Sequence, residues 1–142
     1  MKALSVHQPY ANRIASGEKT IELRTRNTSH RGPLLIVAAK EGDGEPKGMA
    51  LAIVDVIDSR PATQADTIAA CAPVDPNEKA WILANVRRIT PFPVRGRQGR
   101  FFRLTCRGDP RSRWDDRWST SQNPSQRLAR RPAKARSRRW SG

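Results

Sequence analysis

The chain of 142 residues is long enough for one domain with a modest hydrophobic core. It carries 27 Lys and Arg against 13 Asp and Glu, a net charge of +14, which indicates a polyanionic partner such as nucleic acid. No apolar run approaches the roughly 20 residues of a membrane span, and the first residues do not resemble a signal peptide. We therefore expect a cytoplasmic protein without a membrane partner, whose oligomeric state the composition leaves open.

Hydrophobic patterning predicts a strand, a short helix and a second strand at the beginning of the chain. Residues 4–6 are typical of a strand, and Pro9 suits the first turn of a helix that ends at Gly17. Apolar and polar residues then alternate over residues 20–26, which predicts a half-buried strand with charged residues on its polar face.

Two strongly apolar segments, residues 33–39 and 49–57, have strand length, and the first predicts a strand buried on both faces. Residues 59–79 contain three prolines and predict a connecting excursion with one short helix. Further extended segments follow at residues 81–89, 91–94 and 100–105. The predicted fold class is α+β, a small mixed β-barrel of five or six strands with two or three short helices.

The positive charge is concentrated at the end of the chain. Residues 107–142 hold 11 Lys and Arg against 3 Asp, hence +8, which leaves 16 basic and 10 acidic residues, hence +6, for residues 1–106. Leu128 alone represents Val, Ile, Leu, Met and Phe after residue 106, so we predict a disordered tail. Its tryptophans and arginines also suit single-stranded nucleic acid. A third hypothesis is that the tail is an out-of-frame translation product.

Candidate metal ligands are sparse. Two cysteines are too few for a disulfide framework or a zinc cluster, and the two histidines lie far from both in sequence. Asp55 and Asp58 have a spacing that more often caps a turn. We predict neither a metal site nor a cofactor.

Two motifs near the beginning of the chain carry a family resemblance. Residues 4–11 read Leu-Ser-Val-His-Gln-Pro-Tyr-Ala, and residues 17–24 read Gly-Glu-Lys-Thr-Ile-Glu-Leu-Arg. Together with residues 81–85 and 91–96, they form an ordered series that resembles the ASCH domain family, the activating signal cointegrator homology domain. The resemblance covers nearly all of residues 2–105 and implies a PUA-like β-barrel. Tyr10 stands where the family usually has tryptophan.

The family resemblance also implies a cleft beside the start of the helix that accepts RNA or a modified nucleoside. The residues expected to line it are Gln8, Pro9, Tyr10, Lys19, Glu22 and Arg24. Lys19 and Arg24 suit phosphate or carbonyl oxygens, and Glu22 can accept a hydrogen bond from a base amino group. Tyr10 offers a ring on which a base can stack.

Structural interpretations of the same residues stay open at this point. Glu22 and Arg24 can pair with each other on a strand surface, Tyr10 can belong to the core, and Lys19 can interact with the end of the helix. Strict alternation also places Lys19 on the face opposite Glu22. A shared site therefore requires that Lys19 precede the regular strand or that a bulge intervene.

The sequence leaves open whether the module is also an enzyme. One branch of the family resembles acetylcytidine amidohydrolases, which use the lysine of this motif and a threonine three residues later. Lys19 matches that lysine, but Glu22 occupies the threonine position. Glu22 could instead act as a general base with Lys19 polarising the carbonyl. Binding is the first hypothesis, amidohydrolase or ribonuclease activity the second, and protein interaction the third.

Overall fold

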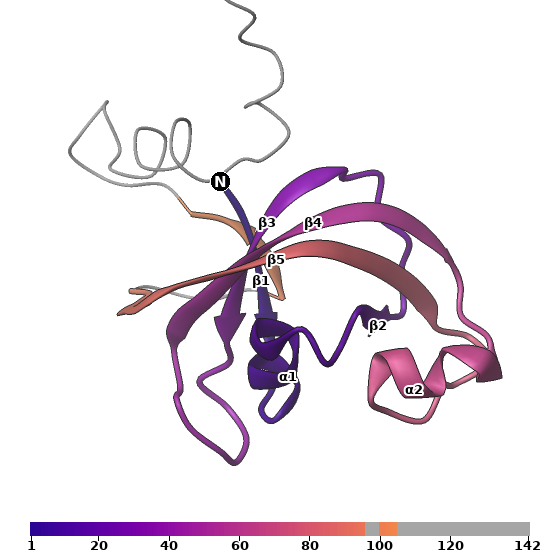
Figure 1. The fold of residues 1–142 in the computed structure, drawn as a ribbon, viewed down its shortest axis with the longest axis horizontal. Coiled ribbons are helices and arrows are strands. Elements are labelled where there is room, and N and C mark those ends of the chain that lie inside the picture. Colours follow the sequence, from indigo (N-terminus) through magenta and orange to yellow (C-terminus); the bar gives the residue numbers. More distant parts are fainter. Residues whose placement is uncertain (96–99, 105–142) are drawn as a thin grey trace, which may run out of the picture. The chain divides into compact units, whose positions relative to one another are not determined.

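A computed structural model describes residues 1–95 and 100–104. Six strands form one mixed sheet in the order β2-β5-β4-β3-β1-β6. The strands are β1 (Lys2–Val6), β2 (Ile21–Arg24), β3 (Gly32–Ala38), β4 (Met49–Pro61), β5 (Lys79–Pro93) and β6 (Phe101–Arg103). The helical segments are α1 (Tyr10–Ser16), the 3-10 turn η1 (Gln64–Asp66) and α2 (Thr67–Ala70). The sheet curls into a half-closed barrel, with β3, β4 and β5 arching over α1 and β2 (Figure 1).

The predicted fold class, α+β with a small mixed sheet, is confirmed. β1 and β3 pair in parallel, and every other neighbouring pair is antiparallel. The helix ends as expected, since Gly17 adopts a φ of +83° and its N–H donates to Ile14 O at 3.0 Å. The apolar run in β3 is buried on both faces: Leu34 and Ile36 join one core cluster, and Leu35 and Val37 join another.

Several strand boundaries differ from the sequence prediction, most clearly those of β2, β4 and β5. The strand expected over residues 20–26 is shorter and becomes β2, whereas β4 extends beyond residue 57 to Pro61. The segments 81–89 and 91–94 form one strand, β5. Its prolines are tolerated because β2 pairs with β5 only as far as Ile82, so the later part of β5 has one edge without a partner among the described residues.

The helix α1 fills the concave side of the curled sheet. Ala11, Ile14 and Ala15 are buried and belong to the same core cluster as Trp81 and Leu83 of β5. No helix in the part of the chain that the structure describes is long and apolar enough to cross a membrane. The predicted tail, residues 107–142, lies outside the described residues.

Candidate functional site

Lys19, Glu22 and Arg24 form a chain of charged contacts inside the domain. Lys19 Nζ lies 3.4 Å from one carboxylate oxygen of Glu22, and Arg24 Nη2 lies 3.0 Å from the other. Backbone carbonyls accept the outer hydrogen bonds, Ala70 O from Lys19 at 2.5 Å and Ser5 O from Arg24 at 2.9 Å. Lys19 is 2% exposed and Glu22 6%, so this chain of contacts is sheltered from water.

The position of Lys19 explains how it reaches Glu22 despite the alternation of the strand. β2 begins only at Ile21, so Lys19 precedes the regular strand. The alternation of side chains between the two faces of β2 therefore does not determine where the Lys19 side chain lies. Glu22 and Arg24 do pair with each other, but the pair is in the interior and not on a solvated surface. The reason is that β2 is an edge strand of a curled sheet, and its polar face is turned toward Ser5 of β1.

The Gln-Pro-Tyr turn has internal partners. Gln8 accepts a hydrogen bond from the backbone N–H of Asn12 at 3.1 Å and donates to Pro46 O at 3.0 Å. Its amide therefore caps α1 and ties the helix to the loop before β4. Pro9 is exposed, and the ring of Tyr10 is half-buried with Lys19 Nζ 5.1 Å from its centroid. Tyr10 thus provides a favourable environment for the buried ammonium group.

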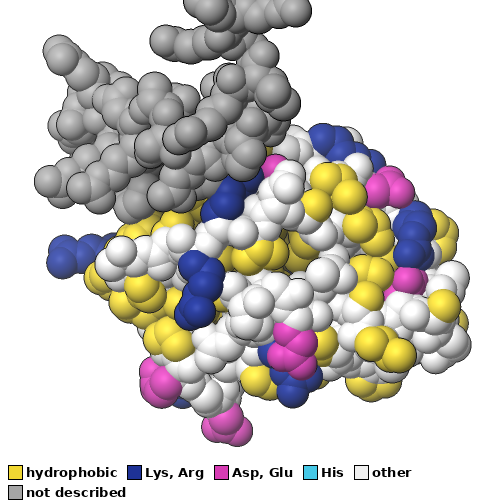
Figure 2. Space-filling model, viewed as in Figure 1, with side chains coloured by type: hydrophobic (Ala, Val, Ile, Leu, Met, Phe, Trp, Pro, Cys, Tyr) yellow, Lys and Arg dark blue, Asp and Glu magenta, His cyan; other side chains and the backbone are white. Residues whose placement is uncertain are grey.

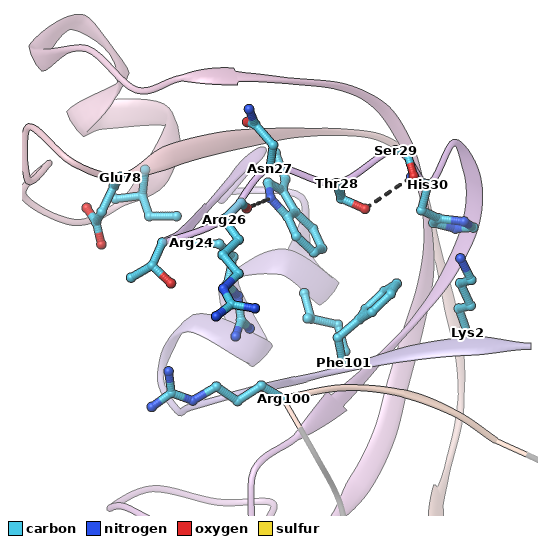
Figure 3. A pocket seen from close by; sticks show the side chains of 14 residues that line it. Lys2, Arg24, Arg26, Asn27, Thr28, Ser29, His30, Glu78, Arg100 and Phe101 are labelled. Carbon is cyan, nitrogen blue, oxygen red and sulfur yellow. Dashed lines mark hydrogen bonds between the residues drawn. The ribbon is translucent and has the colours of Figure 1, made fainter.

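A pocket of about 760 Å³ opens between the two edge strands, next to the loop that joins β2 to β3. It is lined by Lys2, Leu4, Leu23, Arg24, Thr25, Arg26, Asn27, Thr28, Ser29, His30, Glu78, Trp81, Arg100 and Phe101. Of the six predicted site residues, Arg24 is the one that the structure places in this wall. Figure 3 shows Arg24 and Arg26 pointing toward the segment that carries Arg100 and Phe101.

Most of this pocket is not evident from the sequence, because its wall comes from four separate parts of the chain. Four cationic side chains and one carboxylate line it, together with the rings of His30, Trp81 and Phe101. The rings of Trp81 and Phe101 pack edge to face with their centroids 5.7 Å apart, and the centroid of the His30 ring lies 6.2 Å from that of Phe101. In the sequence, the polar composition of the loop before β3 is the one feature that could have indicated this pocket. Folding is needed to bring Phe101 and Lys2 beside that loop.

The loop wall of the pocket is anchored from behind. The indole Nε1 of Trp81 donates to Arg26 O at 2.9 Å, and Ser59 Oγ accepts from the N–H of Thr28 at 3.2 Å. Ser59 Oγ also donates to Asn27 Oδ1 at 3.1 Å. These bonds hold the loop against β4 and β5, so the pocket is largely preformed before any ligand arrives.

Asp55 and Asp58 do not cap a turn, because both lie within β4, and both have protein partners. Asp55 accepts from Arg87 at 2.7 and 3.1 Å and from Asn85 at 3.0 Å. Burial by itself raises the pKa of Asp55, but the hydrogen bonds from Arg87 and Asn85 outweigh burial and hold the pKa below its usual value. Asp58 accepts from the N–H of Ser59. Within the described residues, no three His, Cys, Asp or Glu side chains are grouped for a metal.

Comparison with known families agrees with this architecture. A family model described as ASCH domain matches residues 4–93, more than half of the chain. The chain belongs to the ASCH domain family. The curled six-stranded sheet with short helices is accordingly a small α+β fold of the PUA-like type. A search of curated proteins found no match.

Solved ASCH structures from Zymomonas mobilis share the fold. One is 16% identical with a TM-score of 0.54 and covers 66% of this chain and 73% of its own. A serine-to-alanine mutant of that ASCH protein is 15% identical with a TM-score of 0.55, covering 73% and 87%. A tyrosine-to-phenylalanine mutant is 16% identical with a TM-score of 0.51, covering 66% and 75%. At such low identity, these structures bear on the ASCH fold and not on the chemistry of its site.

Proposed function

We propose that this ASCH domain binds RNA or a modified nucleoside, with the ligand in the pocket that Arg24 reaches from β2. One observation carries the proposal: cationic side chains and aromatic rings face the same preformed space. Cations favour phosphate and carbonyl oxygens, and rings favour stacked bases, so the two together suit nucleic acid. On the face shown in Figure 2, the described Lys and Arg side chains form separate groups and not one continuous basic patch.

Arg24 connects the pocket with the buried charges of the family motif. Its contacts with Glu22 and Ser5 O hold the guanidinium in one orientation, which favours recognition of a planar partner. Its Nε is buried and has no hydrogen-bond partner within the described residues. A buried donor without a partner is costly, but this nitrogen is closed to solvent, so the side chain would have to move before a ligand oxygen or a water could bond to it.

Binding of the full chain to single-stranded RNA and to a panel of modified nucleosides tests the proposal. We expect salt-sensitive RNA binding, and we expect Arg24→Lys to weaken binding about tenfold because lysine keeps the charge but loses the planar fork. Arg88→Lys is the matched control, since Arg88 is exposed on β5 and does not line the pocket. The proposal is wrong when neither RNA nor any nucleoside binds.

A second candidate function is hydrolysis of acylated cytidine, and the distance between Lys19 and Glu22 favours it. The two groups lie 3.4 Å apart in a buried ion pair, so an acylated cytidine would have to open this pair before Glu22 could activate a water and Lys19 polarise the acyl carbonyl. Water would add to the acyl carbon, the C–N bond would break, and the amine would leave with a proton. Release of acetate from N4-acetylcytidine that Lys19→Met abolishes supports this function. Labelled RNA that stays intact with added magnesium or manganese argues against ribonuclease activity.

A further inference from the structure

The exposed fractions of the two large rings differ sharply within the pocket. Trp81 is 5% exposed and donates its N–H to a backbone carbonyl, so it supports the wall from behind. Phe101 is 41% exposed and projects into the space between the edge strands (Figure 3). Trp81 packs edge to face against the Phe101 ring, which favours this orientation of the ring. A planar ligand therefore finds its stacking surface on Phe101 and not on Trp81.

Among the described residues, Lys2, Arg26 and Arg100 beside Phe101 have no carboxylate within ion-pair distance. Lys2 Nζ lies 5.4 Å from the centroid of the Phe101 ring. Among the described residues that line the wall, Glu78 is the one carboxylate, and it accepts a hydrogen bond from the N–H of Asp75. The pocket thus has an excess of positive charge beside its stacking surface, which favours an anion attached to the planar group.

We infer that this pocket binds a phosphorylated nucleoside, with the base against Phe101 and the phosphate between Arg26, Arg100 and Lys2. The inference rests on the proposed function and narrows it, because it assigns the ligand class as nucleoside phosphates in preference to unphosphorylated nucleosides. The volume of about 760 Å³ lies within the range of about 300–1,000 Å³ that is usual for small-molecule sites. Threonine, serine and asparagine side chains of the loop supply further hydrogen bonds.

Calorimetric titration of the full chain with nucleosides and their monophosphates tests the inference directly. We expect each monophosphate to bind at least about tenfold more tightly than its nucleoside, the effect of one charge-assisted hydrogen bond. Arg26→Ala should remove most of that advantage, whereas Arg88→Ala, which deletes the same charge outside the pocket, should leave it unchanged. Phe101→Leu should weaken nucleoside and monophosphate alike by about tenfold, because it removes the stacking surface.

Two further ligands distinguish the source of the nucleoside phosphate. A single-stranded RNA hexamer that displaces the monophosphate at lower concentration identifies a strand as the ligand, and one that fails to displace it identifies the free nucleotide. Equal binding of inorganic phosphate and monophosphate would overturn the role of the base. If RNA or nucleosides bind, but neither adding a phosphate to the nucleoside nor Arg26→Ala changes the affinity, the inference is overturned and the proposed function remains intact. Absence of binding by all these ligands would overturn both.

Discussion

Glu22→Gln should destabilise the domain strongly, because it removes the charge that neutralises two sheltered cations. Lys19 lies 3.4 Å and Arg24 3.0 Å from the carboxylate, and Glu22 is only 6% exposed. The Coulomb attraction in each contact is about 4 kcal/mol at an intermediate effective dielectric. In the variant, Lys19 and Arg24 keep their hydrogen bonds to backbone carbonyls, which offsets part of this loss. We therefore expect a net loss of about 3–5 kcal/mol in the free energy of unfolding, a large part of the stability of a small domain.

Urea unfolding followed by circular dichroism measures this loss. Asp58→Asn is the matched control: Asp58 pairs with Arg31 at 3.5 Å, but the two side chains are about half exposed, so its loss should cost less than about 1 kcal/mol. In a double-mutant cycle, Lys19→Met combined with Glu22→Gln should cost at least about 1 kcal/mol less than the two single changes added together. Equal losses for Glu22→Gln and Asp58→Asn, or strict additivity, would refute the argument for a coupled buried pair.

Three other predictions concern the supports of the fold and the tail. Hydrogen bonds from Arg60 and the backbone of Thr63 hold the pKa of Asp66 well below its usual value, so its contribution is complete above about pH 5. Asp66→Asn should cost about 1–2 kcal/mol at pH 7 in urea unfolding, and this difference should shrink as the pH falls below about 4; a constant difference would contradict it. Trp81→Phe should cost about 1–3 kcal/mol and weaken nucleotide binding through the loss of its bond to Arg26 O; unchanged melting and affinity would argue against it. Deleting residues 107–142 should flatten the salt dependence of RNA affinity without changing ligand preference, and an unaltered slope would count against a role for the tail.

Local sequence patterns were sufficient for the elements that form the core. The apolar run at residues 33–39 predicted β3, and the pair of Pro9 and Gly17 predicted α1, because burial and helix ends depend on nearby residue types. The family resemblance supplied the barrel class, which the family model and the solved ASCH structures bear out. Strand lengths were less accurate, since they depend on where a neighbouring strand stops pairing, as β2 does beside β5.

The motif from Gln8 to Arg24 identified a set of polar residues as candidates for the site. Which groups surround these residues depends on the curl of the sheet. Alternation predicted an exposed polar face for Glu22, but the closing of β2 toward β1 placed this side chain in the interior. The sequence shows that Gln8 carries an amide, but the structure is needed to show that this amide donates a hydrogen bond to Pro46 O within the protein.

The sequence by itself therefore determined the strands, the short helices, the basic character and the family motif, because these follow from local composition and order. Tertiary structure alone decided which cations face a pocket. Lys2, Arg26 and Phe101 are separated by up to 99 positions in the chain, yet the half-closed barrel brings them to one wall. Contacts between such distant segments arise from sheet order and curvature, which no local pattern of residues encodes.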